Sequence, residues 1–294
     1  MKQRIAIVGS GISGLTAAWL LDRRHEITVF ERDDRIGGHS HTVTVAEETG
    51  EVDVDTGFIV FNRRTYPCFT RLLEILGVAT RPSDMSFSFK DDFTGLEYGA
   101  PEPWRLFAQP SNLWRPSFLR MLREILRFYR EASAWLEHAD EDAVLEDFLA
   151  AGGYSAAFKA NHLYPVCAAI WSAPHAKMGE YPAAALFRFF RNHGLLSVAG
   201  RPRWRTITGG SRRYVEKLTA SYRDRIRTGV PVTRIERGAA EVTVHLAGGE
   251  SEGFDQVVLA CHADQALALL AAPSGRERQV LGAFPYAANE TVLH

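Results

Sequence analysis

A glycine pattern near the start of the chain constrains the fold more than any other feature. The motif G-x-G-x-x-G occupies residues 9–14. It follows the apolar run 5–8 and opens the stretch 12–21, in which the apolar residues have helical spacing. A second strand is expected at 26–31. Together these segments predict a β-α-β unit that binds a dinucleotide.

Each residue type in the loop has a separate purpose. Gly9 makes the tight turn, Gly11 lets a diphosphate approach the backbone, and Gly14 lets the helix pack on the strand. The helix N-terminus supplies N–H donors and partial positive charge to the phosphates. Ser10 and Ser13 are predicted to hydrogen-bond phosphate or to cap the helix rather than to act as nucleophiles.

The residues after the second strand favour FAD over NAD. Glu31 ends that strand, where a carboxylate can hold a ribose hydroxyl pair and would disfavour the 2′-phosphate of NADP. The segment ERDDRIGGHSHTV follows, with Arg35, Gly37 and Gly38 a few residues past the acid. This spacing suits a backbone that runs close to a second stretch of cofactor, for which NAD folds have no general need.

Composition describes an ordinary globular chain. It has 294 residues, of which 46% are hydrophobic and 23% charged, and its net charge of −1 gives no bias toward nucleic acid. Cys68, Cys167 and Cys261 have neither disulfide-framework nor metal-type spacing, which indicates a reducing compartment. We find no signal peptide and no apolar run of about 18 residues. The sequence therefore predicts a cytoplasmic protein without a transmembrane segment.

The order of predicted elements indicates one discontinuous domain with an insertion. Strands and helices alternate at both ends of the chain, and helices dominate between them. We therefore predict an α/β fold. A Rossmann-like FAD-binding domain would comprise residues 1–80 and 204–294, and a largely helical α+β substrate domain would comprise residues 81–203.

Two charged segments leave alternatives open. The stretch 117–138 predicts an amphipathic helix with arginines on one face, which would either pack on the core or lie on a membrane surface. Peripheral membrane contact is therefore an open expectation. The stretch 186–227 holds eleven Lys and Arg residues, which form a solvated face or meet an anionic ligand.

Further motifs follow in the rest of the chain. They are DVDTGFIVFN at 53–62, WRTITGGSRRYVEKL at 204–218, VPVTRIE at 230–236 and FDQVVLACHADQAL at 254–267. With the glycine loop, they make the sequence resemble the flavin-containing amine oxidoreductases, the superfamily of monoamine oxidase, protoporphyrinogen oxidase and phytoene desaturase. The resemblance implies that Gly209 and Gly210 lie near the flavin, and that the strand near Val232 meets the adenine.

The loop motif and the resemblance together give one expected set of FAD-binding residues. It consists of Gly9, Ser10, Gly11, Ser13, Gly14, Glu31, Arg32, Arg35, Gly37, Gly38, His39, Asp55, Gly57, Phe58, Val232 and Ala260.

Two segments also resemble one bacterial branch of predicted NAD/FAD-binding proteins. They are AAIWSAP at 168–174 and FRFFRNHGLL at 187–196. Members of that branch often accompany cyclopropane-fatty-acid synthase-like enzymes, which implies lipid-linked chemistry.

The chain departs from the superfamily pattern in three ways. His39 stands where many relatives have Arg, and a histidine can still donate to phosphate. Amine oxidases have a Lys near flavin N5, on a strand that we align with residues 289–294, where no Lys occurs. The C-terminal FAD motif would lie beyond His294, so we expect a C-terminally truncated chain.

Other candidate sites have weaker support. His39 and His41 lack a third metal ligand at useful spacing, and Cys261 and His262 are neighbours that would point apart in a strand. We therefore predict no metal site, and no catalytic acid or base is assigned.

The weak substrate-side or flavin-side candidates are four residues with structural alternatives. As structural residues they would be core aromatics, a buried or capping histidine, and a surface arginine. They are Trp171, His193, Trp204 and Arg205.

The sequence thus predicts an FAD-dependent oxidoreductase that moves a hydride to flavin. Its donor would be a small molecule, either an amine or an apolar, lipid-linked substrate. The alternatives are an NAD-dependent dehydrogenase and a non-catalytic dinucleotide-binding fragment.

Overall fold

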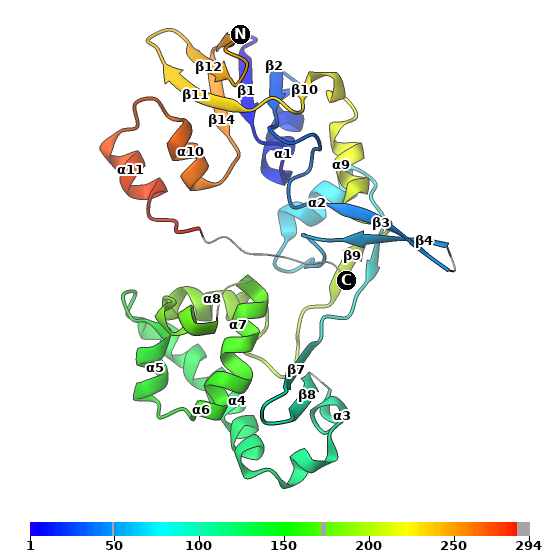
Figure 1. Ribbon diagram of the computed structural model, residues 1–294, viewed down its shortest axis with the longest axis vertical. Coiled ribbons are helices and arrows are strands. Elements are labelled where there is room, and N and C mark those ends of the chain that lie inside the picture. The colour runs from blue at the N-terminus through cyan, green and yellow to red at the C-terminus, as the bar shows by residue number, and fades with distance from the viewer. Residues whose placement is uncertain (49, 101, 172–174, 287–294) are drawn as a thin grey trace.

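A parallel sheet built from both ends of the chain carries the glycine loop. The computed structural model describes residues 1–48, 50–100, 102–171 and 175–286. Strand β1 (Arg4–Val8) lies between β2 (Glu26–Phe30) and β14 (Gln256–Leu259), and β10 (Ile226–Arg227) pairs with the outer edge of β2. Helix α1 (Ile12–Leu21) connects β1 to β2 (Figure 1), which confirms the predicted β-α-β unit.

The sheet is covered on both faces, which explains the continuous apolar run in β1. Ile5 and Ile7 pack with α1, whereas Ala6 packs on the other face against the antiparallel sheet that contains residues 242–246 and 251–254. Every residue of β1 after Arg4 is buried, as expected for a parallel strand with layers on both sides. The carboxyl ends of β1 and β14 are in register, with Val8 opposite Leu259.

The remaining elements of this lobe flank the parallel sheet. They are β3 (Thr42–Glu47), β4 (Gly50–Asp55), β5 (Phe61–Asn62), α2 (Pro67–Ile75), β6 (Thr80–Pro82), β9 (Trp204–Ile207), α9 (Arg212–Thr219), η5 (Arg223–Arg225), β11 (Val232–Arg237), β12 (Val242–Leu246), β13 (Ser251–Phe254), α10 (Ala263–Leu269) and α11 (Gly275–Leu281). β3 pairs with β4, β9 lies between β5 and β6, and β12 lies between β11 and β13.

The middle of the chain forms a second, mainly helical lobe. Its elements are β7 (Phe87–Asp91), β8 (Leu96–Ala100), α3 (Pro103–Leu106), η1 (Pro110–Trp114), α4 (Pro116–Trp135), η2 (Leu136–His138), α5 (Leu145–Ala151), α6 (Ala156–Phe158), η3 (Lys159–Leu163), α7 (Tyr164–Trp171), η4 (His175–Glu180) and α8 (Ala183–Asn192). Its buried cluster is rich in aromatic rings; Phe128, for example, packs edge-on against Phe187 at a centroid distance of 5.4 Å.

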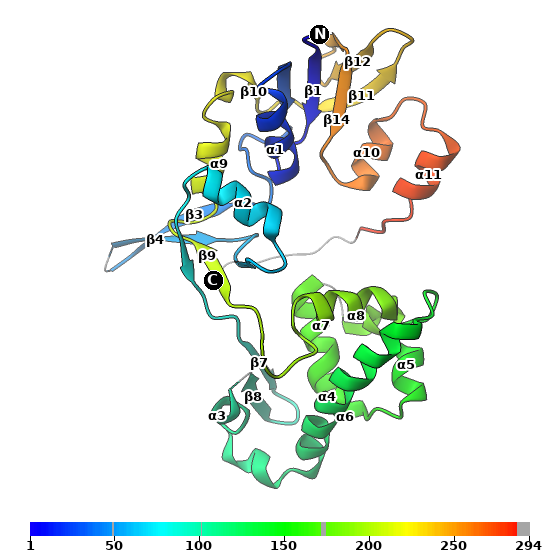
Figure 2. The same ribbon diagram turned by 180° about the vertical axis from the view of Figure 1, so that it is seen from behind.

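The two lobes lie end to end and are joined by paired strands, as Figures 1 and 2 show from opposite sides. β6 pairs antiparallel with β9, so the chain leaves and re-enters the sheet lobe at neighbouring positions. The architecture is a Rossmann-like α/β lobe with an inserted helical lobe, and the predicted fold class is confirmed. Buried residues of the two lobes form separate clusters, and the domain bounds 80/81 and 203/204 stay a prediction.

Helix α4 decides one of the open alternatives. It confirms the helix expected at 117–138, and Phe118, Met121, Ile125 and Phe128 on its apolar face are buried inside the lobe. That face is therefore not available to lipid, and the expectation that this helix rests on a membrane through its apolar side is wrong. Among the described residues, no helix combines the length and apolar character needed to cross a bilayer.

Candidate functional site

Protein atoms lie close to Gly9 and Gly14 of the glycine loop, but the space beside Gly11 is open. A Cβ at Gly9 would lie 2.6 Å from the carbonyl oxygen of Ala260, and one at Gly14 would lie 2.0 Å from the carbonyl oxygen of Gly9. Gly9 also has a φ of +102°, which favours glycine. A Cβ at Gly11, by contrast, would meet no atom within 4 Å. The open side of the loop therefore lies at Gly11.

The helix that starts at this open side has unused donors. Gly11 is the N-cap residue of α1, no side chain caps the helix, and its first turn contains no acid. The predicted capping by Ser10 or Ser13 is therefore not found. Uncapped N–H groups and the helix dipole make such an N-terminus a binding site for an anion such as a diphosphate.

Glu31 holds the glycine loop in place by hydrogen bonds from Ser10. Its Oε2 accepts from the Ser10 N–H at 2.9 Å and from the Ser10 hydroxyl at 2.5 Å, and its Oε1 accepts from the Asp33 N–H at 3.0 Å. Burial alone would raise the pKa of Glu31, but these bonds and one from the Arg32 N–H outweigh it, so the pKa is lowered. The ionised carboxylate has acceptor capacity left for ribose hydroxyls. In this structure the Ser10 hydroxyl donates to Glu31.

The turn after Glu31 contacts the glycine loop at the backbone of Ser10 and Gly11. The Gly37 N–H donates to the Ser10 carbonyl at 2.9 Å, and a Cβ at Gly38 would lie 3.1 Å from Gly11 Cα. Arg35 holds the turn from within, because its Nη1 donates to the Gly38 carbonyl at 2.8 Å. Arg32 is exposed and pairs with Asp33, away from the loop contacts.

Two histidines from distant segments lie beside each other next to the loop. His39 follows Gly38, and His262 follows the end of β14. Their rings are near parallel, with centroids 6.2 Å apart, and His262 stacks on Tyr286 at 4.7 Å. The Tyr286 hydroxyl accepts from the Ala263 N–H at 3.0 Å, which fixes the outer ring. Both histidines are exposed.

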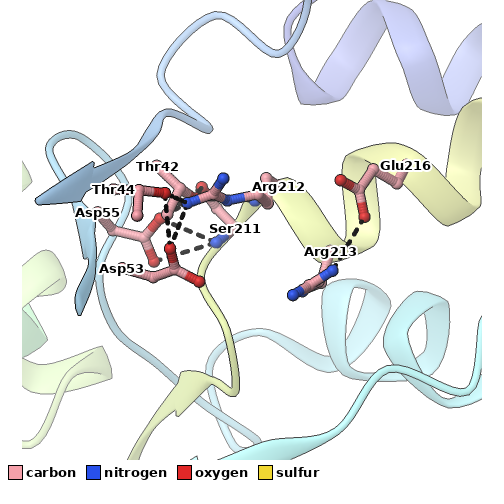
Figure 3. Close-up of polar contacts among 8 residues, drawn as sticks. All are labelled: Thr42, Thr44, Asp53, Asp55, Ser211, Arg212, Arg213 and Glu216. Carbon is pink, nitrogen blue, oxygen red and sulfur yellow. Dashed lines mark hydrogen bonds and ion pairs between the residues drawn. The ribbon is translucent and has the colours of Figure 1, made fainter. Parts of the chain in front are cut away.

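Asp55 joins the β3–β4 hairpin to Ser211 at the start of α9 (Figure 3). It accepts from the Ser211 N–H at 2.8 Å, the Ser211 hydroxyl at 2.7 Å and the Thr42 hydroxyl at 2.6 Å. Thr42 in turn accepts from the Arg212 N–H. The hairpin thus caps the N-terminus of α9, and Asp55 holds Ser211 at the start of that helix.

Gly57 and Phe58 continue the same contact zone. The Phe58 N–H donates to the His39 carbonyl at 2.9 Å, and a Cβ at Gly57 would lie 2.4 Å from that oxygen. The Phe58 ring packs on Phe69 at 5.2 Å. This segment therefore supports the histidine turn from the side of the hairpin.

The start of β11 lies beside Glu31, and Ala260 lies beside Gly9. The Val230 N–H donates to the Glu31 carbonyl at 2.9 Å, which brings the start of β11 beside the predicted ribose position. The Ala260 N–H donates to the Val8 carbonyl at 2.8 Å. The segments predicted to bind FAD thus converge at the carboxyl ends of β1, β2 and β14, where ligands bind in open α/β sheets.

Three of the four substrate-side candidates form one row of aromatic rings between the lobes. Trp171 packs on Phe189 at 4.9 Å, Phe189 stacks on His193 at 3.9 Å, and His193 lies near parallel to Trp204 at 6.3 Å. The row continues the buried cluster of the helical lobe as far as β9.

His193 and Arg205 have defined hydrogen-bond partners. Nδ1 of His193 lies 2.9 Å from the Phe189 carbonyl, which can only accept, so Nδ1 carries a proton and Nε2 is the free nitrogen. Arg205 donates to the hydroxyl and the carbonyl of Thr80, at 2.9 and 2.7 Å. These bonds connect β9 to β6. They account for the position of the Arg205 side chain without an anionic ligand.

A pocket of about 450 Å³ lies beside α9, apart from the glycine loop. Arg35, His41, Arg212 and Arg223 line it together with Glu216, and the loop glycines do not. Arg212 is already paired with Asp53 of the hairpin. Among the described residues, no group of three His, Cys, Asp or Glu side chains is placed to hold a metal ion.

The comparisons with known proteins agree with this geometry. A family model described as flavin containing amine oxidoreductase matches residues 12–288. The chain belongs to this family. The family's cofactor is FAD, and the open side at Gly11, the uncapped α1 and the ionised Glu31 fit that group.

Individual relatives within the family are distant. The flavin-containing amine oxidase A of Bos taurus is 26% identical over 260 residues, which are 84% of this chain and 47% of that protein. A tryptophan 2-monooxygenase of Allorhizobium ampelinum is 34% identical over 116 residues, or 38% of this chain and 16% of the relative.

Solved structures share the fold. Cyclohexylamine oxidase from Brevibacterium oxydans has a TM-score of 0.71 at 22% identity, with 96% of this chain and 63% of that chain covered. Putrescine oxidase bound to putrescine has a TM-score of 0.70 at 19% identity, with the same coverage. The chain thus spans about half of the curated amine oxidase and less than two thirds of these structures.

Several residues of the site were not predicted from the sequence. Thr42, Ser211 and Arg212 complete the hairpin network, and Tyr286 completes the histidine stack. The network had a signal in the alternation of Thr42 and Thr44 with Asp53 and Asp55, which places them opposite each other in a hairpin. The histidine stack had none, because it depends on a contact between three distant segments.

Proposed function

We propose that this chain binds FAD at the glycine loop and is the cofactor-binding part of an FAD-dependent oxidoreductase. The observation that carries the proposal is the open, uncapped helix N-terminus at Gly11 in a chain of the flavin-containing amine oxidoreductase family. FAD as the family cofactor leaves the NAD-dependent alternative without support. The cytoplasmic location predicted from the sequence remains part of this proposal.

The residues have separable roles in the proposed site. The N–H groups at the start of α1 would bind the diphosphate, with His39 and His262 as further donors beside it. Glu31 would accept from the ribose hydroxyls, and the backbone near Val232 would meet the adenine. Arg35 and Asp55 would act indirectly, because they hold the two turns that approach the cofactor. When bound, the flavin would supply the hydride acceptor.

An amine is the substrate class that the relatives favour. The curated relatives include an amine oxidase, and the structural neighbours include oxidases of putrescine and cyclohexylamine. The aromatic row from Trp171 to Trp204 would contribute ring faces on the side of the helical lobe, where cations are attracted to aromatic π-systems. A lipid-linked apolar donor, expected from the bacterial branch, is the second candidate, and a fatty acid isomerase shares the fold with a TM-score of 0.63.

Reconstitution with FAD followed by anaerobic reduction tests the proposal. The purified chain should turn yellow with FAD, and an amine donor should bleach its visible absorbance. Bleaching by an unsaturated fatty acid and not by amines would move the substrate to the lipid class. Retention of FAD without reduction by any donor would support a binding fragment, and uptake of NAD in place of FAD would overturn the proposal.

A further inference from the structure

A half-buried arginine of the helical lobe has no acid opposite it. Arg201 lies in the segment that returns the chain from α8 to β9, and within the described ranges its guanidinium forms no ion pair. Arg225 and Arg227 are also half-buried, but they pair with Asp22 and Glu252. An arginine that leaves bulk water normally has an acidic partner. The charge of Arg201 therefore indicates a place for an anion from outside the chain.

The return segment holds Arg201 in place. Its Nε donates to the Ser197 carbonyl at 2.7 Å. Gly194 at the start of the segment has a φ of +70°, and a Cβ there would lie 2.6 Å from Cδ of Pro202. The segment thus folds on itself on both sides of Arg201, which leaves the two Nη groups of the guanidinium to bond elsewhere.

The Arg201 guanidinium lies beside the Tyr129 hydroxyl and the His162 ring. Burial raises the pKa of Tyr129, and the charge of Arg201 and a hydrogen bond from it oppose that rise. Burial and the charge of Arg201 lower the pKa of His162 to about 4, so this ring is neutral near pH 7. A guanidinium cannot accept a hydrogen bond, so the Tyr129 hydroxyl accepts from Arg201 and keeps its own proton for another acceptor.

The His162 ring is fixed by its surroundings. The Tyr98 hydroxyl donates to the Asn161 carbonyl at 2.8 Å and lies 3.0 Å from Nδ1 of His162. The rings of Phe87 and Phe158 pack beside it, each at a centroid distance of 6.0 Å. His162 belongs to η3, which is a π-helix, a rare geometry that occurs often at functional sites.

The acids on the elements that carry these residues do not neutralise Arg201. Glu97 neighbours the buried Tyr98 on β8 but is exposed, as expected for the opposite face of a strand. The return segment 193–203 and η3 contain no acid. The acids in the first and last parts of α4 that lie nearest to Tyr129 have partners on their own helix, Glu124 with Arg120 and Glu131 with Arg127.

We propose that Arg201 and Tyr129, with His162 beside them, bind the carboxylate of an organic acid. The planar guanidinium matches the two oxygens of a carboxylate, and the Tyr129 hydroxyl donates its remaining proton to the same group. Leu195 and Leu196 of the return segment are half-buried, which favours an acid with an apolar remainder. An amino acid and a fatty acid share this chemistry. The use of this site by a substrate rests on the proposed function, whereas carboxylate binding itself does not require FAD.

Calorimetric titration of the purified chain with a matched pair of ligands tests the proposal. The acid 3-phenylpropionate should bind about tenfold or more tightly than the alcohol 3-phenylpropanol, because only the acid can pair with Arg201. No binding of the acid, or equal affinity for the two ligands, would overturn the proposal. FAD retention is measured on the same samples, so loss of carboxylate binding is distinguished from loss of FAD.

Three variants locate the binding. Arg201→Gln should lower the affinity for 3-phenylpropionate by about tenfold or more, and Tyr129→Phe by about fivefold, without changing the affinity for the alcohol. Arg203 is exposed in the same segment, so Arg203→Gln is the matched control and should bind like the wild type. Thermal unfolding checks that each variant is folded, and Tyr129→Phe decides the matter if Arg201→Gln does not fold. Equal losses in Arg201→Gln and Arg203→Gln would contradict a site at Arg201.

Two further ligands distinguish the sources of the carboxylate. L-phenylalanine that binds more tightly than 3-phenylpropionate would support the site and identify an amino acid as its ligand. Decanoate that binds more tightly would support the site and identify a fatty acid. In either case Arg201→Gln should remove the preference, and a preference that survives in this variant would overturn the proposal.

Discussion

Glu31 links the glycine loop to the strand that follows it. It is 9% exposed and receives hydrogen bonds from Ser10, Arg32 and Asp33. The position of an acid at the end of the second strand could be predicted from the sequence. Its bond with Ser10 could not, because residues 21 apart in the chain come together only after β1 and β2 pair. The sequence therefore predicted a carboxylate at the end of the strand, and the structure adds its hydrogen bonds with Ser10.

The pH dependence of stability should report this carboxylate. Because the folded-state pKa of Glu31 is lowered from 4.5, its stabilisation is complete above that value and is lost as pH falls through the folded-state pKa. Glu31→Gln should cost about 1–3 kcal/mol near neutral pH and should flatten the loss of stability below pH 4.5. Urea unfolding of both proteins from neutral pH to pH 3 measures the difference. Parallel pH profiles would contradict the role given to Glu31.

At the scale of elements, two helix N-termini near the proposed cofactor differ in how they are satisfied. The β3–β4 hairpin caps α9 through Asp55 and Thr42, whereas α1 has no side-chain cap. Elements such as β1, α1, β2 and α4 could be predicted from periodicity. The capping across elements could not, because the sequence places Asp55 and Ser211 156 residues apart.

Asp55→Asn should destabilise the sheet lobe by about 1–3 kcal/mol, because one oxygen that accepts from Ser211 becomes a donor. Asp53→Asn on the same hairpin is the matched control. It removes a partly exposed ion pair with Arg212 and should cost less than about 1 kcal/mol. Denaturant unfolding compares the two variants, and equal losses would argue against Asp55 as the positioning residue.

At the scale of the whole molecule, the chain divides into lobes with separate buried clusters. The alternation of α/β, helical and α/β segments was enough to predict this insertion. The contacts between lobes were not predictable in detail, since the row from Trp171 to Trp204 joins residues from α7, α8 and β9. The exposed end of the helical lobe was also not predicted. Trp114 is exposed and Phe118 is buried, although the two residues are close in sequence.

FAD should therefore protect the two lobes unequally. FAD at about 100 times its Kd raises the free energy of unfolding of the state that binds it by about 2.7 kcal/mol. In hydrogen exchange, amides of β1, α1 and β2 should become slower with FAD, whereas those of α4 should change little. Equal protection of both lobes would show that the cofactor couples them, contrary to the separate clusters.

The most direct test of FAD binding at the glycine loop is the FAD affinity of Gly11→Ala. Gly11 has φ −67° and ψ 177°, which alanine adopts readily, and its Cβ would meet no protein atom within 4 Å. The variant should keep the wild-type unfolding temperature and lose FAD affinity by about a hundredfold or more, because its methyl group fills the side where the diphosphate would approach. Gly14→Ala should instead unfold the loop, as its Cβ would lie 2.0 Å from the Gly9 carbonyl oxygen. A folded Gly11→Ala protein that binds FAD as tightly as the wild type would contradict the proposed site.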